Sequence, residues 1–169
     1  MIMKSIKNMA LSAMLTFGAF AAVTYTACTK DDCKDVVCNN GGTCNGGSCV
    51  CPTGYEGANC DTKSFLGSWK GTDVCSSGTY NNITITINTA TAAANDVIIT
   101  NPGGFGSSVT VTGTMTTDGK TITISSQSVG GGRTLSGTMT LTSPTTFTFG
   151  YTASDNSTND VCNGQYTKQ

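Results

Sequence analysis

Six cysteines fall within a short stretch of the chain, and this cluster limits the fold of the N-terminal part more than any other feature. From Cys33 to Cys60 they follow the pattern C-x4-C-x5-C-x4-C-x-C-x8-C. A segment this short buries too little apolar surface to be stable through a core, so covalent links must supply its stability. The spacing alone allows about 15 disulfide pairings. A zinc site is the alternative use of these thiols, and the export signal described below disfavours it.

The sequence between these cysteines resembles that of epidermal-growth-factor-like (EGF-like) modules. The resemblance covers residues 33–60 and is carried by NGGTC at 40–44 and CPTGYEG at 51–57. It implies three disulfide bonds, which are Cys33–Cys44, Cys38–Cys49 and Cys51–Cys60.

Some modules of this family bind calcium through acidic residues that precede the first cysteine. Asp31 and Asp32 occupy that place in this chain. They are weak calcium candidates, because a hard cation takes about six to eight oxygen ligands and the loop at residues 45–48 is too short to carry the other positions of such a site.

The N-terminus has the three parts of an export signal. Lys4 and Lys7 precede an apolar run over residues 9–23, and a segment reading YTAC follows at 25–28. The apolar run is shorter than the ~20 residues that a membrane-spanning helix needs. We therefore expect residues 1–27 to be a cleaved signal peptide.

The YTAC segment at residues 25–28 resembles the lipobox of bacterial lipoproteins, in which the cysteine, here Cys28, is acylated. Tyr25 departs from the aliphatic residue that is usual at its position. The alternative is an unpaired ninth thiol; cysteine parity favours lipidation, because the other eight can all pair. Residues 28–32 would then form a lipidated N-terminus, with palmitate as a typical acyl group. TKDD at 29–32 resembles the export tag of Bacteroidetes surface lipoproteins, with a charged linker as the alternative. These resemblances imply a protein anchored in the bacterial outer membrane and facing the exterior.

Beyond a linker at residues 61–63 the composition changes, and residues 64–169 alternate threonine or serine with apolar side chains. Alternation with period two indicates strands with one buried face, and threonine suits the exposed face. Turn signals such as Asp118-Gly119 separate the apolar runs. We predict an all-β domain with eight short strands at residues 67–74, 80–87, 96–100, 108–115, 121–125, 133–141, 145–152 and 161–167.

Short connections favour an antiparallel meander, and closure into an up-and-down barrel would remove its unpaired edges. Cys75 follows the first predicted strand and Cys162 lies at the start of the eighth. Because these strands are antiparallel neighbours in a closed barrel, we expect a Cys75–Cys162 disulfide bond. FLGSWKG at 65–71 resembles the Gly-x-Trp opening of lipocalin-like barrels, in which the tryptophan, here Trp69, closes one end. Lys168 is the one candidate for its basic partner; a β-sandwich is the alternative fold.

The residue types present favour binding over catalysis. The chain contains no histidine, which removes histidine-dependent triads, dyads and metal sites. No two carboxylates are placed for glycoside hydrolysis. Without Lys4 and Lys7 the mature chain has seven basic and ten acidic side chains and no basic stripe, so nucleic acid is not an expected partner. We expect no enzyme activity and no cofactor.

The expected function is recognition of another molecule at the cell surface. The first hypothesis is a binding or adhesion module that contacts a protein or glycan through exposed loops and the EGF-like module. The second is a carrier of a small apolar ligand, because an eight-stranded barrel holds either packed side chains or one small ligand; a structural surface component is the third. The residues expected to line such a cavity, beside the small Gly113 and Gly137, are Trp69, Val109, Val111, Met115, Leu135, Met139, Phe147 and Phe149.

Overall fold

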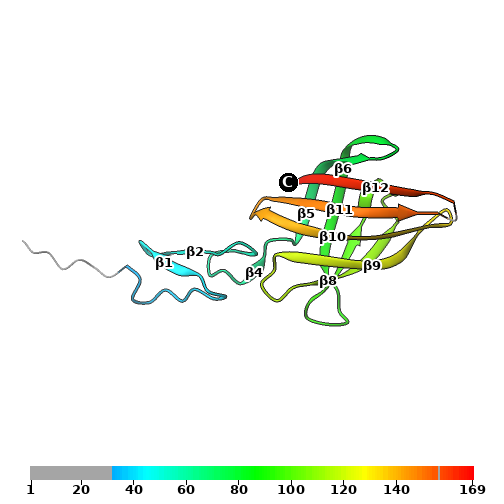
Figure 1. The fold of residues 1–169 in the computed structure, drawn as a ribbon. Coiled ribbons are helices and arrows are strands. Elements are labelled where there is room, and N and C mark those ends of the chain that lie inside the picture. Colours follow the sequence, from blue (N-terminus) through cyan, green and yellow to red (C-terminus); the bar gives the residue numbers. More distant parts are fainter. Residues whose placement is uncertain (1–31, 156) are drawn as a thin grey trace, which may run out of the picture.

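The computed structural model describes residues 32–155 and 157–169 and places them in an elongated molecule with two parts (Figure 1). A small cysteine-rich module occupies one end and a closed β-barrel the other. The predicted signal peptide, Cys28 and residues 29–31 of the predicted export tag lie outside the described residues. Within the described chain, no helix has the length and apolar character needed to span a bilayer.

Three disulfide bonds and two short strand pairs build the cysteine-rich module, residues 33–60 with the adjoining linker. The bonds join Cys33 to Cys44, Cys38 to Cys49 and Cys51 to Cys60, which are the pairs implied by the EGF resemblance. Among residues 32–63, Cys60 is the one apolar side chain that is fully buried. Covalent links therefore take the place of a core here. The strands are β1 (Thr43–Asn45), which pairs with β2 (Ser48–Val50), and β3 (Tyr55–Glu56), which pairs with β4 (Thr62–Lys63).

Eight antiparallel strands form the barrel, and each pairs with its neighbours in the sequence. The last strand pairs with the first, which closes the sheet. This closure confirms the predicted all-β barrel and excludes the sandwich. The strands are β5 (Gly67–Cys75), β6 (Gly78–Thr89), β7 (Asp96–Thr100), β8 (Thr110–Met115), β9 (Thr121–Gly130), β10 (Arg133–Ser143), β11 (Thr146–Ser154) and β12 (Asn159–Lys168), with a short 3₁₀ turn, η1 (Pro102–Gly104), between β7 and β8.

The largest difference from the predicted strands concerns β9, which continues to Gly130 instead of ending at Ser125. The apolar alternation fails after Ser125 because the next three residues are polar, and the register with β10 shifts between Leu135 and Gly137. Gln127 supports this irregular stretch: its side-chain oxygen accepts the amide of Thr112 at 2.8 Å. A side-chain contact of this kind leaves no period-two signal in the sequence.

Alternate residues of every strand point into the barrel and form one core. On β6 the inward residues are Ile83, Ile85 and Ile87, all buried. At the end of the barrel nearest the module, the ring of Phe147 packs 4.8 Å from Trp69 and 4.9 Å from Tyr166, measured between ring centroids. Each large apolar side chain buried in this way contributes about 1.5–3 kcal/mol to folding.

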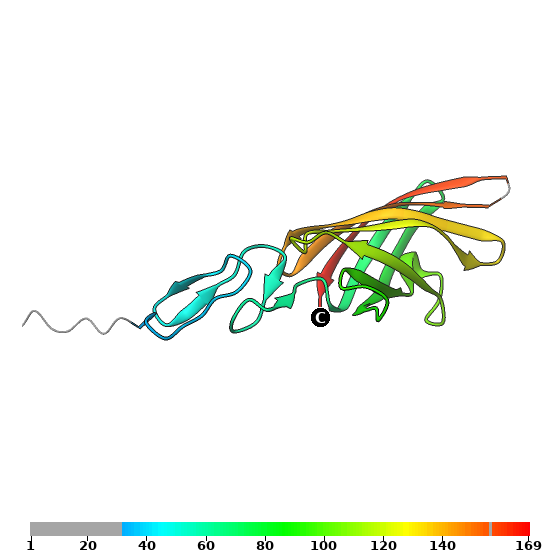
Figure 2. The same ribbon diagram turned by 90° about the horizontal axis from the view of Figure 1, so that it is seen from below.

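The module is joined to this end of the barrel by several polar contacts, and both views show it continuing the long axis of the barrel (Figure 1, Figure 2). The hydroxyl of Tyr55 donates to the carbonyl of Thr117 at 2.6 Å, and Lys63 Nζ donates to Asn95 Oδ1 at 2.8 Å. Gly54 adopts φ +106°, and a Cβ there would stand 2.2 Å from the carbonyl oxygen of Asp118. The two backbones touch only because this residue is glycine.

Lys168 completes the junction from the last strand. Its ammonium group pairs with the carboxylate of Glu56 in the module and donates to the carbonyl of Ser64 at 3.0 Å. The same group lies 5.5 Å from the ring centroid of Trp69, within the range of a cation–π contact. Lys168, the one candidate for the basic partner of Trp69, therefore does contact that tryptophan.

Candidate ligand site at the barrel mouth

Four connections meet at the end of the barrel opposite the module, and we call this end the mouth. They are residues 76–77, 101–109, 131–132 and 155–158, which join β5 to β6, β7 to β8, β9 to β10 and β11 to β12 (Figure 1). Between them lies a pocket with a volume of about 280 Å³. Its lining residues are Cys75, Ser77, Tyr80, Gly103, Gly104, Phe105, Arg133, Tyr151, Ala153, Asp155, Thr158, Asp160 and Cys162.

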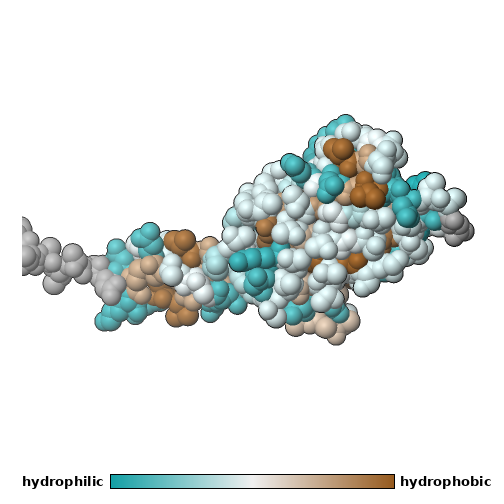
Figure 3. Space-filling view, viewed as in Figure 1, coloured by the Kyte–Doolittle hydropathy of each residue, from teal (hydrophilic) through white to brown (hydrophobic). Residues whose placement is uncertain are grey.

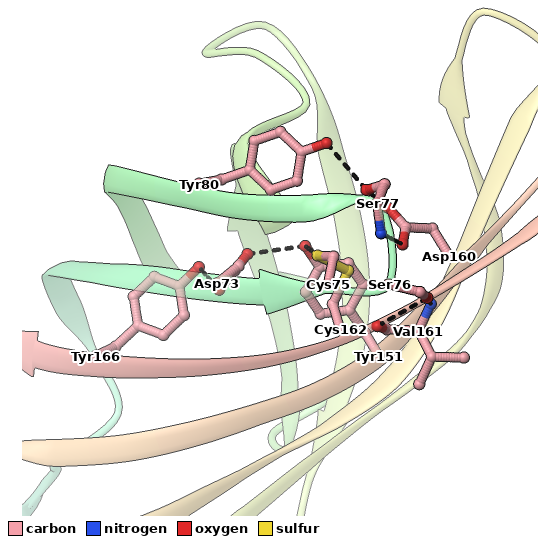
Figure 4. The surroundings of a disulfide bond; sticks show 10 residues. All are labelled: Asp73, Cys75, Ser76, Ser77, Tyr80, Tyr151, Asp160, Val161, Cys162 and Tyr166. Atoms are coloured by element: carbon pink, nitrogen blue, oxygen red, sulfur yellow. Dashed lines mark hydrogen bonds between the residues drawn. A yellow bond between two sulfur atoms is a disulfide. The ribbon is translucent and has the colours of Figure 1, made fainter.

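One wall of the pocket is held by a covalent and a polar link between the first and last strands. Cys75 and Cys162 face each other across β5 and β12 and form a disulfide bond. Just beyond it, the amide of Ser77 donates to Asp160 Oδ1 at 3.0 Å, and the Ser77 hydroxyl bonds to the other carboxylate oxygen. The Ser77 and Tyr80 hydroxyls lie 3.0 Å apart, so the Tyr80 ring is tied to the same group (Figure 4).

Charged groups of both signs face the pocket. Hydrogen bonds from Ser77, with a smaller contribution from the charge of Arg133, lower the pKa of Asp160. Backbone amides of Ser157 and Thr158 lower the pKa of Asp155 in the same way. Both carboxylates are therefore ionised at neutral pH. The guanidinium of Arg133 donates no hydrogen bond to any residue within 32–155 or 157–169.

The floor of the pocket leads to a buried polar cluster. Tyr151 lines the pocket, and its hydroxyl donates to Asp73 Oδ2 at 2.8 Å; the hydroxyl of Tyr166 donates to the other oxygen at 2.7 Å (Figure 4). Asp73 is fully buried. Burial raises the pKa of the Asp73 carboxyl, and the two phenol hydrogen bonds oppose that shift. Burial and the nearby Asp73 charge raise the pKa of both tyrosines, so both stay protonated donors.

The connection that contains η1 covers part of the mouth in a fixed conformation. Asn101 adopts φ +57° at its start, donates to the carbonyl of Thr84 at 2.8 Å and accepts the amide of Gly106 at 2.7 Å. A Cβ at Gly103 would stand 2.6 Å from the hydroxyl of Tyr151. Glycine at this position lets the connection lie against the pocket floor.

The structure places the eight predicted cavity residues in the core instead of around the pocket. Seven of them are buried, Val109 packs against the core from the connection before β8, and none of the eight lines the mouth pocket. A Cβ at Gly137 would stand 2.5 Å from Tyr151 Cβ, and one at Gly113 would stand 2.5 Å from Ile122 Cγ2. The space left by these glycines is thus taken by neighbouring side chains.

Sequence reasoning missed the residues that do face the pocket. Tyr80 and Phe105 lie at a strand start and in a glycine-rich connection, and each looks like a scattered apolar residue on its own. Arg133 offered a weak signal: it is the only arginine of the chain and follows three glycines. Only the closed register of the barrel brings these positions together.

The structure bears on two candidate metal sites, one formed by a cluster of potential ligands in the barrel and one suggested by the sequence for calcium. Asp160 and the sulfur atoms of Cys75 and Cys162 lie within 4.8 Å of one another. The two sulfurs are bonded to each other, so they are not the thiolates that a metal ion requires. Of the weak calcium candidates, Asp32 is exposed at the start of the described chain, and Asp31 lies outside it.

Comparisons with known proteins found one matching family and several solved structures. Residues 28–60 match the EGF-like domain family. No curated protein matches the chain. Among solved structures, a redesigned β-barrel, mFAP1, bound to DFHBI is 23% identical, covers 62% of this chain and 95% of its own, and superposes with a TM-score of 0.46. The structure of EF1p2_mFAP2b bound to DFHBI is 15% identical, with 63% and 94% coverage and a TM-score of 0.47. Another redesigned barrel, b11L5F_LGL, is 23% identical, with 63% and 92% coverage and a TM-score of 0.44.

Proposed function

We propose that this protein is a non-enzymatic, surface-anchored binding protein: acylation of Cys28 holds it in the bacterial outer membrane, and the mouth of the barrel is its recognition site. The proposal rests on one observation above all. The residues that line the pocket lie at the end of the barrel opposite the EGF-like module, which begins five residues after Cys28 in the sequence. A chain anchored at its N-terminus would therefore present the mouth to the exterior.

The junction between module and barrel supports this arrangement. The contacts of Tyr55, Lys63 and Lys168 hold the barrel against the last loop of the EGF-like module. A spacer tied to its neighbour by hydrogen bonds keeps the mouth at a defined distance from the membrane. A freely jointed linker would let the barrel lie on the lipid surface.

The mixed polar and aromatic lining of the mouth pocket is the second observation that supports a binding function. Pockets that bind small molecules combine apolar walls with a few placed polar groups, and this one combines Tyr80 and Phe105 with Arg133, Asp155 and Asp160. Carriage of a small apolar ligand in the barrel interior, the second candidate, has less support. The inward side chains pack against one another there, as the ring of Phe149 does against Tyr151 at 4.5 Å between centroids.

The anchoring part is tested in a diderm bacterial host by labelling with an alkyne analogue of palmitate and by fractionation. We expect the wild-type protein to be labelled, to sediment with the outer membrane and to be cleaved by protease added to intact cells. Cys28→Ala should lose the label and leave the membrane fraction, whereas Thr29→Ala should behave as the wild type. A labelled Cys28→Ala protein would contradict the proposal.

The binding part is tested by native mass spectrometry of the full-length protein in detergent. We expect a small-molecule adduct that is lost on denaturation and is absent from Thr158→Trp, in which an indole fills the pocket. Thr123→Trp, on the exposed outer face of β9, should keep the adduct. A lipophilic probe that binds equally to both variants would favour the carrier hypothesis over the mouth.

A further inference from the structure

The pocket at the mouth offers two kinds of surface to one ligand. Tyr80, on β6 with 48% of its surface exposed, and Phe105, half-buried in the connection before β8, contribute aromatic rings. On the face drawn in Figure 3, most of the barrel surface is neutral or hydrophilic. Aromatic faces carry partial negative charge, and polarised C–H groups pack well against them.

The polar groups of the pocket leave specific hydrogen-bonding capacity unused. The Oδ1 atom of Asp155 accepts from Ser157 and Thr158, whereas its Oδ2 atom accepts no hydrogen bond from any described residue. Arg133 contributes a fork of N–H donors. The pocket therefore presents both an anionic acceptor and a cationic donor that the fold itself does not consume.

The charge pattern disfavours ionic ligands of either sign. An anion would meet the carboxylates of Asp155 and Asp160, and an organic cation would meet the guanidinium of Arg133. A purely apolar ligand would remove water from all three charged groups without replacing their hydrogen bonds, which is costly. An uncharged ligand that both donates and accepts hydrogen bonds can pair with the carboxylates and the guanidinium. If it also has C–H faces, it can pack against the aromatic rings.

Size narrows the ligand further. At about 280 Å³ the pocket lies just under the range of roughly 300–1,000 Å³ that is typical for drug-sized ligands. It therefore suits a single ring-sized unit. A saccharide ring has the required chemistry, since its hydroxyls both donate and accept and its axial C–H groups form apolar faces.

We propose that the mouth pocket binds one uncharged saccharide ring, either a free monosaccharide or the terminal unit of a glycan. This inference rests on the proposed role of the mouth as a recognition site and specifies its ligand. Arg133 and Asp155 hold the hydroxyls, and Tyr80 and Phe105 contact the C–H face. Ser77 positions Asp160 at the side of the pocket.

The test uses the full-length protein in detergent, folded under oxidising conditions and applied to immobilised glycans that end in neutral hexoses, N-acetylhexosamines, deoxyhexoses or uronic acids. Two further probes are a fatty acid and an alkylammonium compound. We expect saturable binding to one or more neutral termini. Arg133→Gln should weaken that binding about tenfold or more, because it removes hydrogen bonds from a charged donor, and Phe105→Ala should weaken it as well. Lys120→Gln, which loses the same charge at the opposite end of the barrel, should bind as the wild type.

Competition with the matching free monosaccharide distinguishes a free monosaccharide ligand from the terminal unit of a glycan. Equal affinity for the free sugar identifies a monosaccharide ligand, and much weaker competition identifies a glycan terminus; either result supports the inference. Binding confined to uronic acids, to the fatty acid or to the ammonium compound, and altered by Arg133→Gln, would overturn the saccharide assignment and leave the mouth as a binding site. Neutral-glycan binding that Arg133→Gln and Phe105→Ala both leave unchanged would overturn the assignment of these residues. Failure of every probe, together with no adduct in native mass spectrometry, would count against the proposed function itself.

Discussion

Asp73 is the one fully buried acidic side chain among the residues that the structure describes, and its environment couples protonation to folding. Burial raises its native pKa above the unfolded value, despite hydrogen bonds from Tyr166 and Tyr151. A group of this kind contributes stability that is complete below the unfolded pKa and is lost as the pH rises through the native pKa. From Asp73 alone, the unfolding free energy therefore falls as the pH rises above about 4 and through the raised native pKa of Asp73.

Asp73→Asn should remove this dependence. The variant keeps the size of the side chain and an oxygen that accepts from a tyrosine. We expect its stability relative to the wild type to increase as the pH rises from about 4 to 7, measured by urea denaturation at several pH values. Three other carboxyl groups have lowered pKa values and change the unfolding free energy in the opposite direction with pH: those of Asp118, Asp155 and Asp160. Because both proteins contain them, their contributions cancel in the stability difference between variant and wild type. A constant difference across this range would contradict the prediction.

Glycines within strands provide a second test at the level of single residues. A Cβ at Gly164 would stand 2.2 Å from Asp73 Oδ1 and 2.6 Å from the Tyr166 ring, whereas the nearest atom at Gly150 is 3.6 Å away. We expect Gly164→Ala to lower the unfolding free energy by about 1–3 kcal/mol through overpacking. Gly150→Ala should be neutral or slightly stabilising, and equal effects of the two substitutions in urea denaturation would show that crowding is not the cause.

At the level of elements, the pairing of β12 with β5 decides whether the sheet is open or closed. The Cys75–Cys162 bond links these strands across a sequence separation of 87 residues. In the chain-entropy account, closing a loop of this length stabilises the fold by about 4–5 kcal/mol. The bond and the ladder of hydrogen bonds thus act on the same strand pair.

The variant Cys75→Ala/Cys162→Ala should remain a barrel with an unfolding free energy lower by up to about 4–5 kcal/mol. Urea denaturation of both proteins, with and without reductant, measures this change. Reductant should destabilise the barrel transition of the wild type by the same amount and leave that of the double variant unchanged. A double variant as stable as the oxidised wild type would rule out a stabilising role for the bond.

The strands could be predicted from the sequence because each leaves a local signal, and the Cys75–Cys162 bond followed from the strand order of a closed barrel. The three pairings in the module, by contrast, were implied by the EGF resemblance, because the cysteine spacing alone left them open. The strand predicted at residues 96–100 has the same bounds as β7, and the one predicted at residues 67–74 matches β5 to within one residue. Period-two alternation also places Asp73 on the inward face of β5 with Trp69, a clue that the sequence analysis did not use. The pocket could not be predicted, because Tyr80 near the start of β6, Phe105 in the connection before β8 and Arg133 at the start of β10 are brought together only by the register of the closed barrel.

For the whole molecule, the junction between the EGF-like module and the barrel depends on Lys168. Its ammonium group forms an ion pair with Glu56, donates a hydrogen bond to the carbonyl of Ser64 and lies over the ring of Trp69. The side chain of Lys168 is 18% exposed. Lys168→Met should lower the unfolding free energy by about 1–3 kcal/mol, since a hydrogen-bonded charge pair is lost, and should speed amide hydrogen exchange at residues 54–64. Lys70→Met, an exposed lysine on β5, is the matched control. Unchanged exchange in Lys168→Met would show that the other contacts hold the junction alone.

The chain enters the barrel at Gly67 and leaves it at Lys168, and both positions lie at the end that faces the module. All four connections at the mouth are consequently internal loops between paired strands, and none of them carries the attachment to the module. Such loops tolerate insertion and substitution far better than the strands that they join. The loops of the mouth can therefore vary in length and chemistry while the strands of the barrel and the junction with the module stay the same.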